Sequence, residues 1–159
     1  QQLNPDVRRQ IEKLSVFVNP HQALTPFIKQ LTGITQDQVD SGETIGRAYD
    51  LLSDMHKINK SFINPVTWGG GDVRAIFEEL SSSGVDTRDN CFGRRWVDAK
   101  TLYVSWRIAN GSFPAGGLKK SLVSLGMRFK GRTHNALDDS INTFYIFRRL
   151  VNKLKETKV

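Results

Sequence analysis

One histidine and two aspartates are crowded into residues 131–139 (GRTHNALDD), directly before the longest helical pattern of the chain. An imidazole exchanges a proton near neutral pH, so His134 could take a proton from water. The carboxylates of Asp138 and Asp139 are oxygen ligands of the kind that Mg²⁺ and Mn²⁺ prefer. Acidic side chains in a first helical turn also complement the helix dipole, which is a purely structural role. The segment therefore admits hydrolytic chemistry without requiring it.

A second candidate site is the run Trp68-Gly69-Gly70-Gly71-Asp72, between an apolar stretch and a helical pattern. Ligands gather at strand ends in open α/β sheets, and glycines let the backbone approach a substrate closely. Asp72 equally suits a helix N-cap, and Trp68 equally suits the core. The run lacks the Lys-Ser/Thr pair of a phosphate-cradling loop, which excludes that motif.

Taken together, the two candidate sites could form one metal site. Carboxylates from separate strand–helix junctions, here Asp72 and Asp139, could hold two divalent ions. Two ions about 4 Å apart are the usual arrangement for in-line attack on a phosphodiester bond.

The whole chain has 23 Lys and Arg against 16 Asp and Glu, and the basic residues are concentrated in one part of it. Residues 88–132 carry a net charge of +8, with two acids (Asp89 and Asp98) and ten bases: Arg88, Arg94, Arg95, Lys100, Arg107, Lys119, Lys120, Arg128, Lys130 and Arg132. Such an excess suits a polyanionic partner, since phosphates bind mainly through Lys and Arg. A solvated basic surface is the alternative.

The elements that must position these residues alternate in type, which predicts an α/β fold. Strands are expected at residues 11–19, 62–68 and 95–98. Helices are expected at 24–31, 41–58, 72–83, from after 98 through 106, at 118–125 and at 135–155. No linker divides the 159 residues, so we expect a single domain over residues 1–159.

The composition excludes several classes of protein. Hydrophobic residues make up 38% and charged residues 25%, the balance of a globular chain rather than a disordered one. No apolar run approaches the ~18 residues of a membrane span. A single cysteine, Cys91, rules out an internal disulfide framework and indicates a reducing, cytoplasmic compartment.

Several ordered segments resemble the DEDDh-type 3′→5′ exonucleases, in the branch that includes histone-mRNA-trimming enzymes. Residues 117–142 resemble the third motif, and His134 and Asp139 meet its His-x4-Asp spacing. Residues 68–77 resemble the second motif. Residues 24–42 and 94–98 resemble further segments of this branch.

The resemblance implies an RNase H-like α/β fold, with a mixed central sheet flanked by helices. It implies two Mg²⁺ or Mn²⁺ ions, with Asp72 and Asp139 as ligands and His134 as general base. Asp138 is then a neighbour that pairs with the helix dipole. The terminal nucleotide is expected at Leu31, Thr32, Gly33 and Ile34 and at the loop with Trp68 and Gly70, and Arg132 is a candidate phosphate contact.

One departure from the family pattern is clear: its first motif, Asp-x-Glu, does not occur in these 159 residues. We expect that motif and its strand to precede Gln1 in the natural chain. The sequence then predicts a metal-dependent 3′→5′ exonuclease that acts on single-stranded 3′ ends of RNA or DNA and releases nucleoside 5′-monophosphates. A nucleic-acid-binding or scaffold module without catalysis, on the same fold, is the first alternative. A basic protein-interaction domain is the second.

Overall fold

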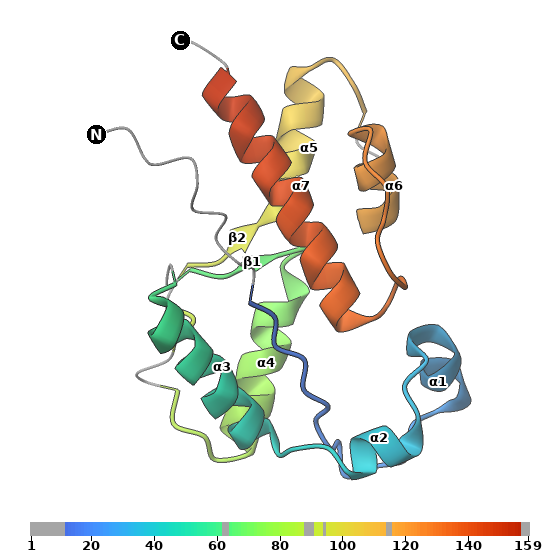
Figure 1. The fold of residues 1–159 in the computed structure, drawn as a ribbon, viewed down its shortest axis with the longest axis vertical. Coiled ribbons are helices and arrows are strands. Elements are labelled where there is room, and N and C mark those ends of the chain that lie inside the picture. Colours follow the sequence, from blue (N-terminus) through green and yellow to red (C-terminus); the bar gives the residue numbers. More distant parts are fainter. Residues whose placement is uncertain (1–11, 62–63, 88–90, 94, 114–115, 157–159) are drawn as a thin grey trace.

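The computed structural model describes residues 12–61, 64–87, 91–93, 95–113 and 116–156. Helices surround a short parallel sheet (Figure 1). In chain order the elements are α1 (Pro26–Thr32), α2 (Gln36–Asp40), α3 (Ile45–Asn59), β1 (Val66–Thr67), α4 (Gly71–Ser82), β2 (Val97–Asp98), α5 (Ala99–Ala109), α6 (Leu118–Ser124) and α7 (Ala136–Glu156).

β1 and β2 pair in parallel, with Val66 opposite Val97 and Thr67 opposite Asp98. A further backbone bond of 2.9 Å runs from the amide of Val97 to the carbonyl of Pro65. Parallel strands end at the same edge of a sheet, so the loop before α4 and the start of α5 lie side by side. Both strands are shorter than expected, but the predicted alternation of strands and helices is confirmed.

The core lies where α7 packs against α5, α6 and β1 (Figure 1). Its buried members come from those three helices and the turn after α6: Tyr103, Leu118, Leu122, Leu125, Ile146 and Leu150. Ile146 and Leu150 are four residues apart on α7, which is the spacing of one helix face. This packing holds the N-terminal turn of α7, and with it the His134 segment, in a defined place.

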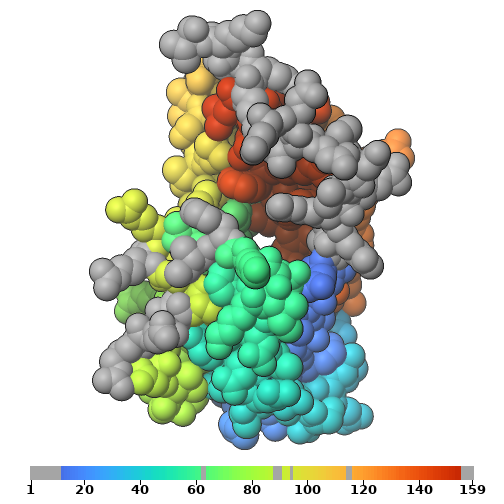
Figure 2. Space-filling view, turned by 60° about the vertical axis from the view of Figure 1, so that its left-hand side comes forward, coloured from blue at the N-terminus to red at the C-terminus, as the bar shows by residue number. Residues whose placement is uncertain are grey.

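A second apolar cluster joins α3, α4 and the segment before β2. The rings of Phe77, Phe92 and Trp96 contact one another at centroid distances of 5.1–6.3 Å, and Tyr49 lies 5.8 Å from Phe92. Figure 2 shows α3 on the surface of this part of the molecule, below α7. The cluster holds α4, whose first turn carries Asp72 of the second candidate site.

The strand predicted over residues 11–19 is wrong for the residues that the structure describes. Residues 12–17 have no regular structure, and Val18 forms only an isolated parallel bridge with Glu43. Two backbone bonds make this bridge, Asn19 to Glu43 at 2.9 Å and Glu43 to Phe17 at 2.8 Å. A β-favouring composition forms a strand only where a neighbouring strand is available.

The helix predicted at 41–58 begins later, and a short helix precedes it. Thr44 is the N-cap of α3 and accepts a 3.1 Å bond from the amide of Arg47. The unpredicted α2 starts with a capping box, in which Thr35 and Gln38 each bond the other's backbone amide. The Thr-x-x-Gln pattern was the available signal for this helix.

The remaining helices start and end within two or three residues of their predicted bounds. Among the described residues, no helix is both long enough and apolar enough to cross a membrane.

Candidate active site

His134 lies in the loop directly before α7 and has a positive φ of 66°. Its backbone amide donates a hydrogen bond to the carboxylate of Asp139. The side chain of His134 is exposed. The predicted pair therefore meets through the main chain of the histidine, which leaves the imidazole free to face solvent or a substrate.

Asp139 is half-buried in the first turn of α7. Burial is the largest influence on its pKa, which is raised above the ordinary value of an aspartate. The charge of Asp138 raises the pKa further, while the hydrogen bond and charge of His134 oppose the shift. A carboxylate that is costly to keep charged gains most from a nearby cation.

Asp138 has a role that differs from simple dipole pairing. Its Oδ2 accepts a 2.8 Å bond from the amide of Arg132, and its own amide donates to Asn135 Oδ1 at 3.1 Å. Adjacent carboxylates thus hold the same loop at two points, Asp138 at Arg132 and Asp139 at His134. The prediction that Asp138 supports structure agrees with these contacts, but its partner is the loop.

Asn142 was missed by the sequence reading. Its side chain is fully buried and bonds both backbone groups of Lys130, at 3.0 and 2.8 Å, and the carbonyl of Asp138 at 2.7 Å. The available signal was an asparagine four residues before Ile146 on the apolar stripe of α7. A buried amide with matched partners fixes the segment that leads to His134.

Asp72 lies in the first turn of α4 and is exposed. The N-cap of α4 is Gly70, without any side-chain capping bond. The alternative in which Asp72 serves as a helix cap is therefore wrong, because the cap lies two residues before it and the helix begins at Gly71.

The glycine loop between β1 and α4 is open. A methyl group added to Gly69, Gly70 or Gly71 would meet no described atom within 4 Å. Gly69 has a φ of 100°, which only glycine adopts readily. Trp68 is half-buried and packs against the core, with its ring 6.0 Å from that of Tyr103. Gly70 is thus available to a ligand, whereas much of Trp68 is used in packing.

Asp98 is a second residue that the sequence reading did not place in the site. It is the N-cap of α5 and accepts bonds from the amides of Lys100 and Thr101 and from the Thr101 hydroxyl. The amide of Gly69 also donates to it, at 2.9 Å. Burial acts most strongly on the pKa of Asp98 and raises it, but these hydrogen bonds together lower it below its ordinary value.

The predicted nucleotide segment forms the end of α1. Leu31 and Thr32 are its last residues, Gly33 is the C-cap with a φ of 75°, and the amide of Ile34 donates to Thr32 Oγ1 at 3.2 Å. The guanidinium of Arg132 lies on this turn, and its Nη2 donates to the carbonyl of Gln30 at 3.0 Å. The structure therefore brings residues 31–34 beside the His134 loop.

The donor chemistry of Asp72 and Asp139 suits Mg²⁺ or Mn²⁺. Across the ranges that the structure describes, no group of three or more His, Cys, Asp or Glu side chains is placed to hold a metal ion. These two carboxylates therefore supply only part of a donor set.

The basic stretch divides into free and engaged side chains. Lys100, Lys119, Lys120 and Arg128 are exposed. Arg107 is half-buried and donates to the carbonyl of Phe113, and Lys130 lies 4.8 Å from the ring centre of Tyr145. Arg88 and Arg94 lie outside the described residues.

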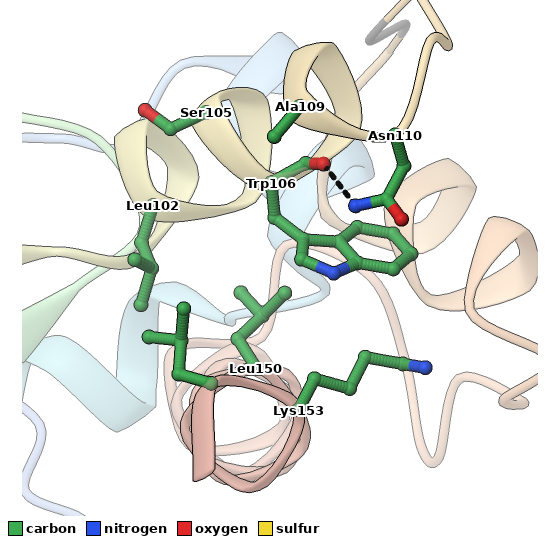
Figure 3. A pocket seen from close by; sticks show the side chains of 8 residues that line it. Leu102, Ser105, Trp106, Ala109, Asn110, Leu150 and Lys153 are labelled. Carbon is green, nitrogen blue, oxygen red and sulfur yellow. Dashed lines mark hydrogen bonds between the residues drawn. The ribbon is translucent and has the colours of Figure 1, made fainter. Parts of the chain in front are cut away.

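A hollow of about 610 Å³ lies between α5 and α7 (Figure 3). Leu102, Trp106, Leu150 and Lys153 line it, and the Asn110 side chain bonds the Trp106 carbonyl at 2.8 Å. Leu150 is eleven residues beyond Asp139, roughly 16 Å along α7 at about 1.5 Å per residue. The described residues that line this hollow include no carboxylate or imidazole, and none of them belongs to the candidate site.

Curated relatives of the chain are named as 3′-5′ exonucleases. The chain is 27% identical over 136 residues to the 3′-5′ exonuclease Snipper of Drosophila melanogaster, covering 75% of this chain and 46% of that protein. It is 27% identical over 144 residues to ERI1 exoribonuclease 3 of Homo sapiens, covering 85% of this chain and 41% of that protein. The chain thus spans less than half the length of these relatives.

The solved structures that resemble this chain are also nucleases. The nuclease domain of 3′hExo, a DEDDh family member bound to rAMP, matches with a TM-score of 0.67 and 27% identity, over 87% of this chain and 70% of that one. A 3′-exonuclease solved for its recognition of the histone mRNA stem-loop matches with a TM-score of 0.74 and 27% identity, over 86% and 49%. Cell-death related nuclease 4 has a TM-score of 0.74 at 20% identity, over 87% and 49%, and supports the fold alone.

These neighbours confirm the predicted α/β, RNase H-like fold. The sequence profile of the family described as Exonuclease matches residues 2–147. The chain therefore belongs to the exonuclease family.

Proposed function

We propose that this chain forms a single domain of a metal-dependent 3′→5′ exonuclease, which cleaves single-stranded ends and releases nucleoside 5′-monophosphates. RNA is the favoured substrate, because matched relatives are named exoribonucleases and one matched structure concerns an mRNA 3′ end. The observation that carries the proposal is the His134–Asp139 pair at the start of α7, within a family match over residues 2–147.

In the proposed reaction, water attacks the terminal phosphorus and the bond from phosphorus to the 3′ oxygen breaks. His134 takes the proton from the attacking water, and the leaving 3′ oxygen gains a proton from solvent. Residues 31–34 and the open loop at Gly70 hold the terminal nucleotide. The exposed basic side chains near α6 attract the phosphate backbone of the nucleic acid.

The DEDDh type implies divalent metal ions, and we propose two Mg²⁺ or Mn²⁺ ions with Asp72 and Asp139 among their ligands. Such ions stabilise the charge that develops on the phosphate and lower the pKa of bound water. The described residues contribute these two carboxylates and the base.

The test is shortening of a 5′-labelled single-stranded RNA and of the matching DNA, with Mn²⁺ and with a chelator, together with chromatographic detection of the released mononucleotides. We expect a 3′→5′ ladder that requires the metal ion. Metal-independent binding of both oligonucleotides without any cleavage would favour the non-catalytic binding module instead. If the protein shows no cleavage and no salt-dependent binding, the result would favour a protein-interaction domain.

A further inference from the structure

The guanidinium of Arg132 is held by the end of α1. Its Nη2 donates a 3.0 Å bond to the carbonyl of Gln30, 102 residues away in sequence. This carbonyl belongs to the last turn of α1, where backbone acceptors lack a helical partner. A methyl group on Gly33 would overlap the guanidinium, so that group lies directly on the glycine.

The backbone of the same residue is held by α7. The Arg132 amide donates to Asp138 Oδ2 at 2.8 Å, and a methyl group on Gly131 would overlap the Asp138 carboxyl group. His134 follows two residues later and is bonded through its own amide to Asp139. Arg132 therefore links two parts of the fold. Its side chain bonds to the end of α1, and its main chain is part of the loop that carries His134.

We propose that Arg132 is a positioning residue, which sets the 31–34 segment relative to His134, and not a phosphate contact. The proposal rests on the proposed function, in which residues 31–34 hold the terminal nucleotide and His134 activates water. The Gln30 carbonyl accepts from the guanidinium and Gly33 lies directly against it, so the end of α1 sets the position and orientation of this group. Reacting groups must be placed to within a fraction of an ångström, since a displacement of about 1 Å can cost about 100-fold in rate.

Kinetics separate the two roles. Arg132→Met should lower kcat by about 10- to 100-fold and raise KM, because residues 31–34 and His134 are no longer held in a fixed position relative to each other. The salt slope of single-stranded oligonucleotide binding should stay unchanged, whereas loss of one phosphate contact would reduce it by about 0.7. Arg132→Lys keeps the charge but lacks the planar fork, so its kcat should resemble that of Arg132→Met. A reduced slope in Arg132→Met that is restored in Arg132→Lys would overturn the proposal.

Hydrogen exchange without nucleic acid tests the coupling independently of activity. Gly33→Ala displaces the guanidinium and should speed amide exchange in residues 131–139, although the substitution lies about 100 residues away in the chain. Arg132→Met should speed exchange in residues 26–34. In an Arg132→Met background, Gly33→Ala should produce no further change in residues 131–139.

Gly84→Ala is the matched control. Gly84 follows α4 with a φ of 72°, close to the 75° of Gly33, but a methyl group there meets no described atom within 4 Å. This variant should show the cost of a strained glycine position and leave exchange in residues 131–139 unchanged. Unchanged exchange in both Gly33→Ala and Arg132→Met would overturn the positioning role. A wild-type protein without nuclease activity would instead overturn the proposed function and leave the exchange result standing.

Discussion

The backbone amide of Gly69 donates a 2.9 Å hydrogen bond to Asp98 Oδ1, so the helix cap of α5 also holds the glycine loop that leads to Asp72. Thr67 and Asp98 are opposite each other in the parallel pair, which brings the two loops together. The position of one candidate carboxylate therefore depends on another aspartate, 29 residues from Gly69.

Asp98→Ala should lower the free energy of unfolding by about 1–2 kcal/mol, because a helix cap and a loop contact are lost together. The pKa of Asp98 is lowered in the folded state. The Asp98 carboxylate therefore contributes its full stabilisation above the pKa that the same residue has in the unfolded chain. That contribution is lost as the pH falls through the folded-state pKa. Urea unfolding at pH 7 and at lower pH checks both points, and the difference between wild type and Asp98→Ala should shrink with acidity. Asp54→Ala, at an exposed position of α3, is the control and should show little change.

His134→Asn should lower kcat by roughly 10²- to 10⁴-fold with little change in oligonucleotide binding, because the general base is removed. Asparagine is chosen because it tolerates the positive φ of 66° better than alanine does. Single-turnover cleavage with Mn²⁺ measures the effect. His21→Asn, at a φ of 51° in a loop, is the matched control and should cleave normally. Near-normal turnover in His134→Asn would return His134 to a structural role.

Asp139→Asn should abolish cleavage without lowering thermal stability at pH 7. The pKa of Asp139 is raised in the folded state, so the ionised carboxylate opposes folding once the pH exceeds its unfolded pKa. A neutral amide removes that opposition, and its oxygen still accepts from the His134 amide. Thermal unfolding from pH 3 to 8 should show the variant gaining stability relative to wild type as the pH rises. A marked loss of stability at pH 7 would contradict this account.

Asp72→Asn should abolish cleavage and weaken Mn²⁺ binding, with a stability change below about 1 kcal/mol. The carboxylate caps no helix, so only its favourable interaction with the α4 dipole is lost. Calorimetric titration with Mn²⁺ and urea unfolding measure the two effects. Glu79→Gln, exposed near the other end of α4, provides a control that should bind Mn²⁺ as wild type does. An active but destabilised Asp72→Asn protein would assign the residue to structure alone.

Charge reversal on α6 should weaken binding of single-stranded RNA and flatten its salt slope. Lys119→Glu with Lys120→Glu removes two exposed cations, and each phosphate contact on a single strand contributes about 0.7 to the slope. Fluorescence anisotropy over a range of KCl concentrations measures the slope. Arg47→Glu with Lys57→Glu changes the net charge equally on α3 and should alter the slope less. Equal slopes in the two double variants would place α6 away from the substrate.

The sequence by itself determined most of the helices and the resemblance of the chain to a family. Helix positions followed from apolar spacing, and the structure adds caps such as Thr25 and Thr44, which also act over a single turn. The His134-x4-Asp139 spacing is equally local, because it depends only on the loop and first turn of one helix. These features needed no knowledge of distant segments.

Only the tertiary structure decided which distant groups share a contact. The bond from Arg132 to Gln30 spans 102 residues and that from Gly69 to Asp98 spans 29, and neither leaves a periodic trace in the sequence. The strand expected at residues 11–19 failed for the same reason, since a strand needs a partner and Val18 finds only Glu43. Helices satisfy their hydrogen bonds within one segment, whereas strands and loop contacts depend on what the fold places beside them.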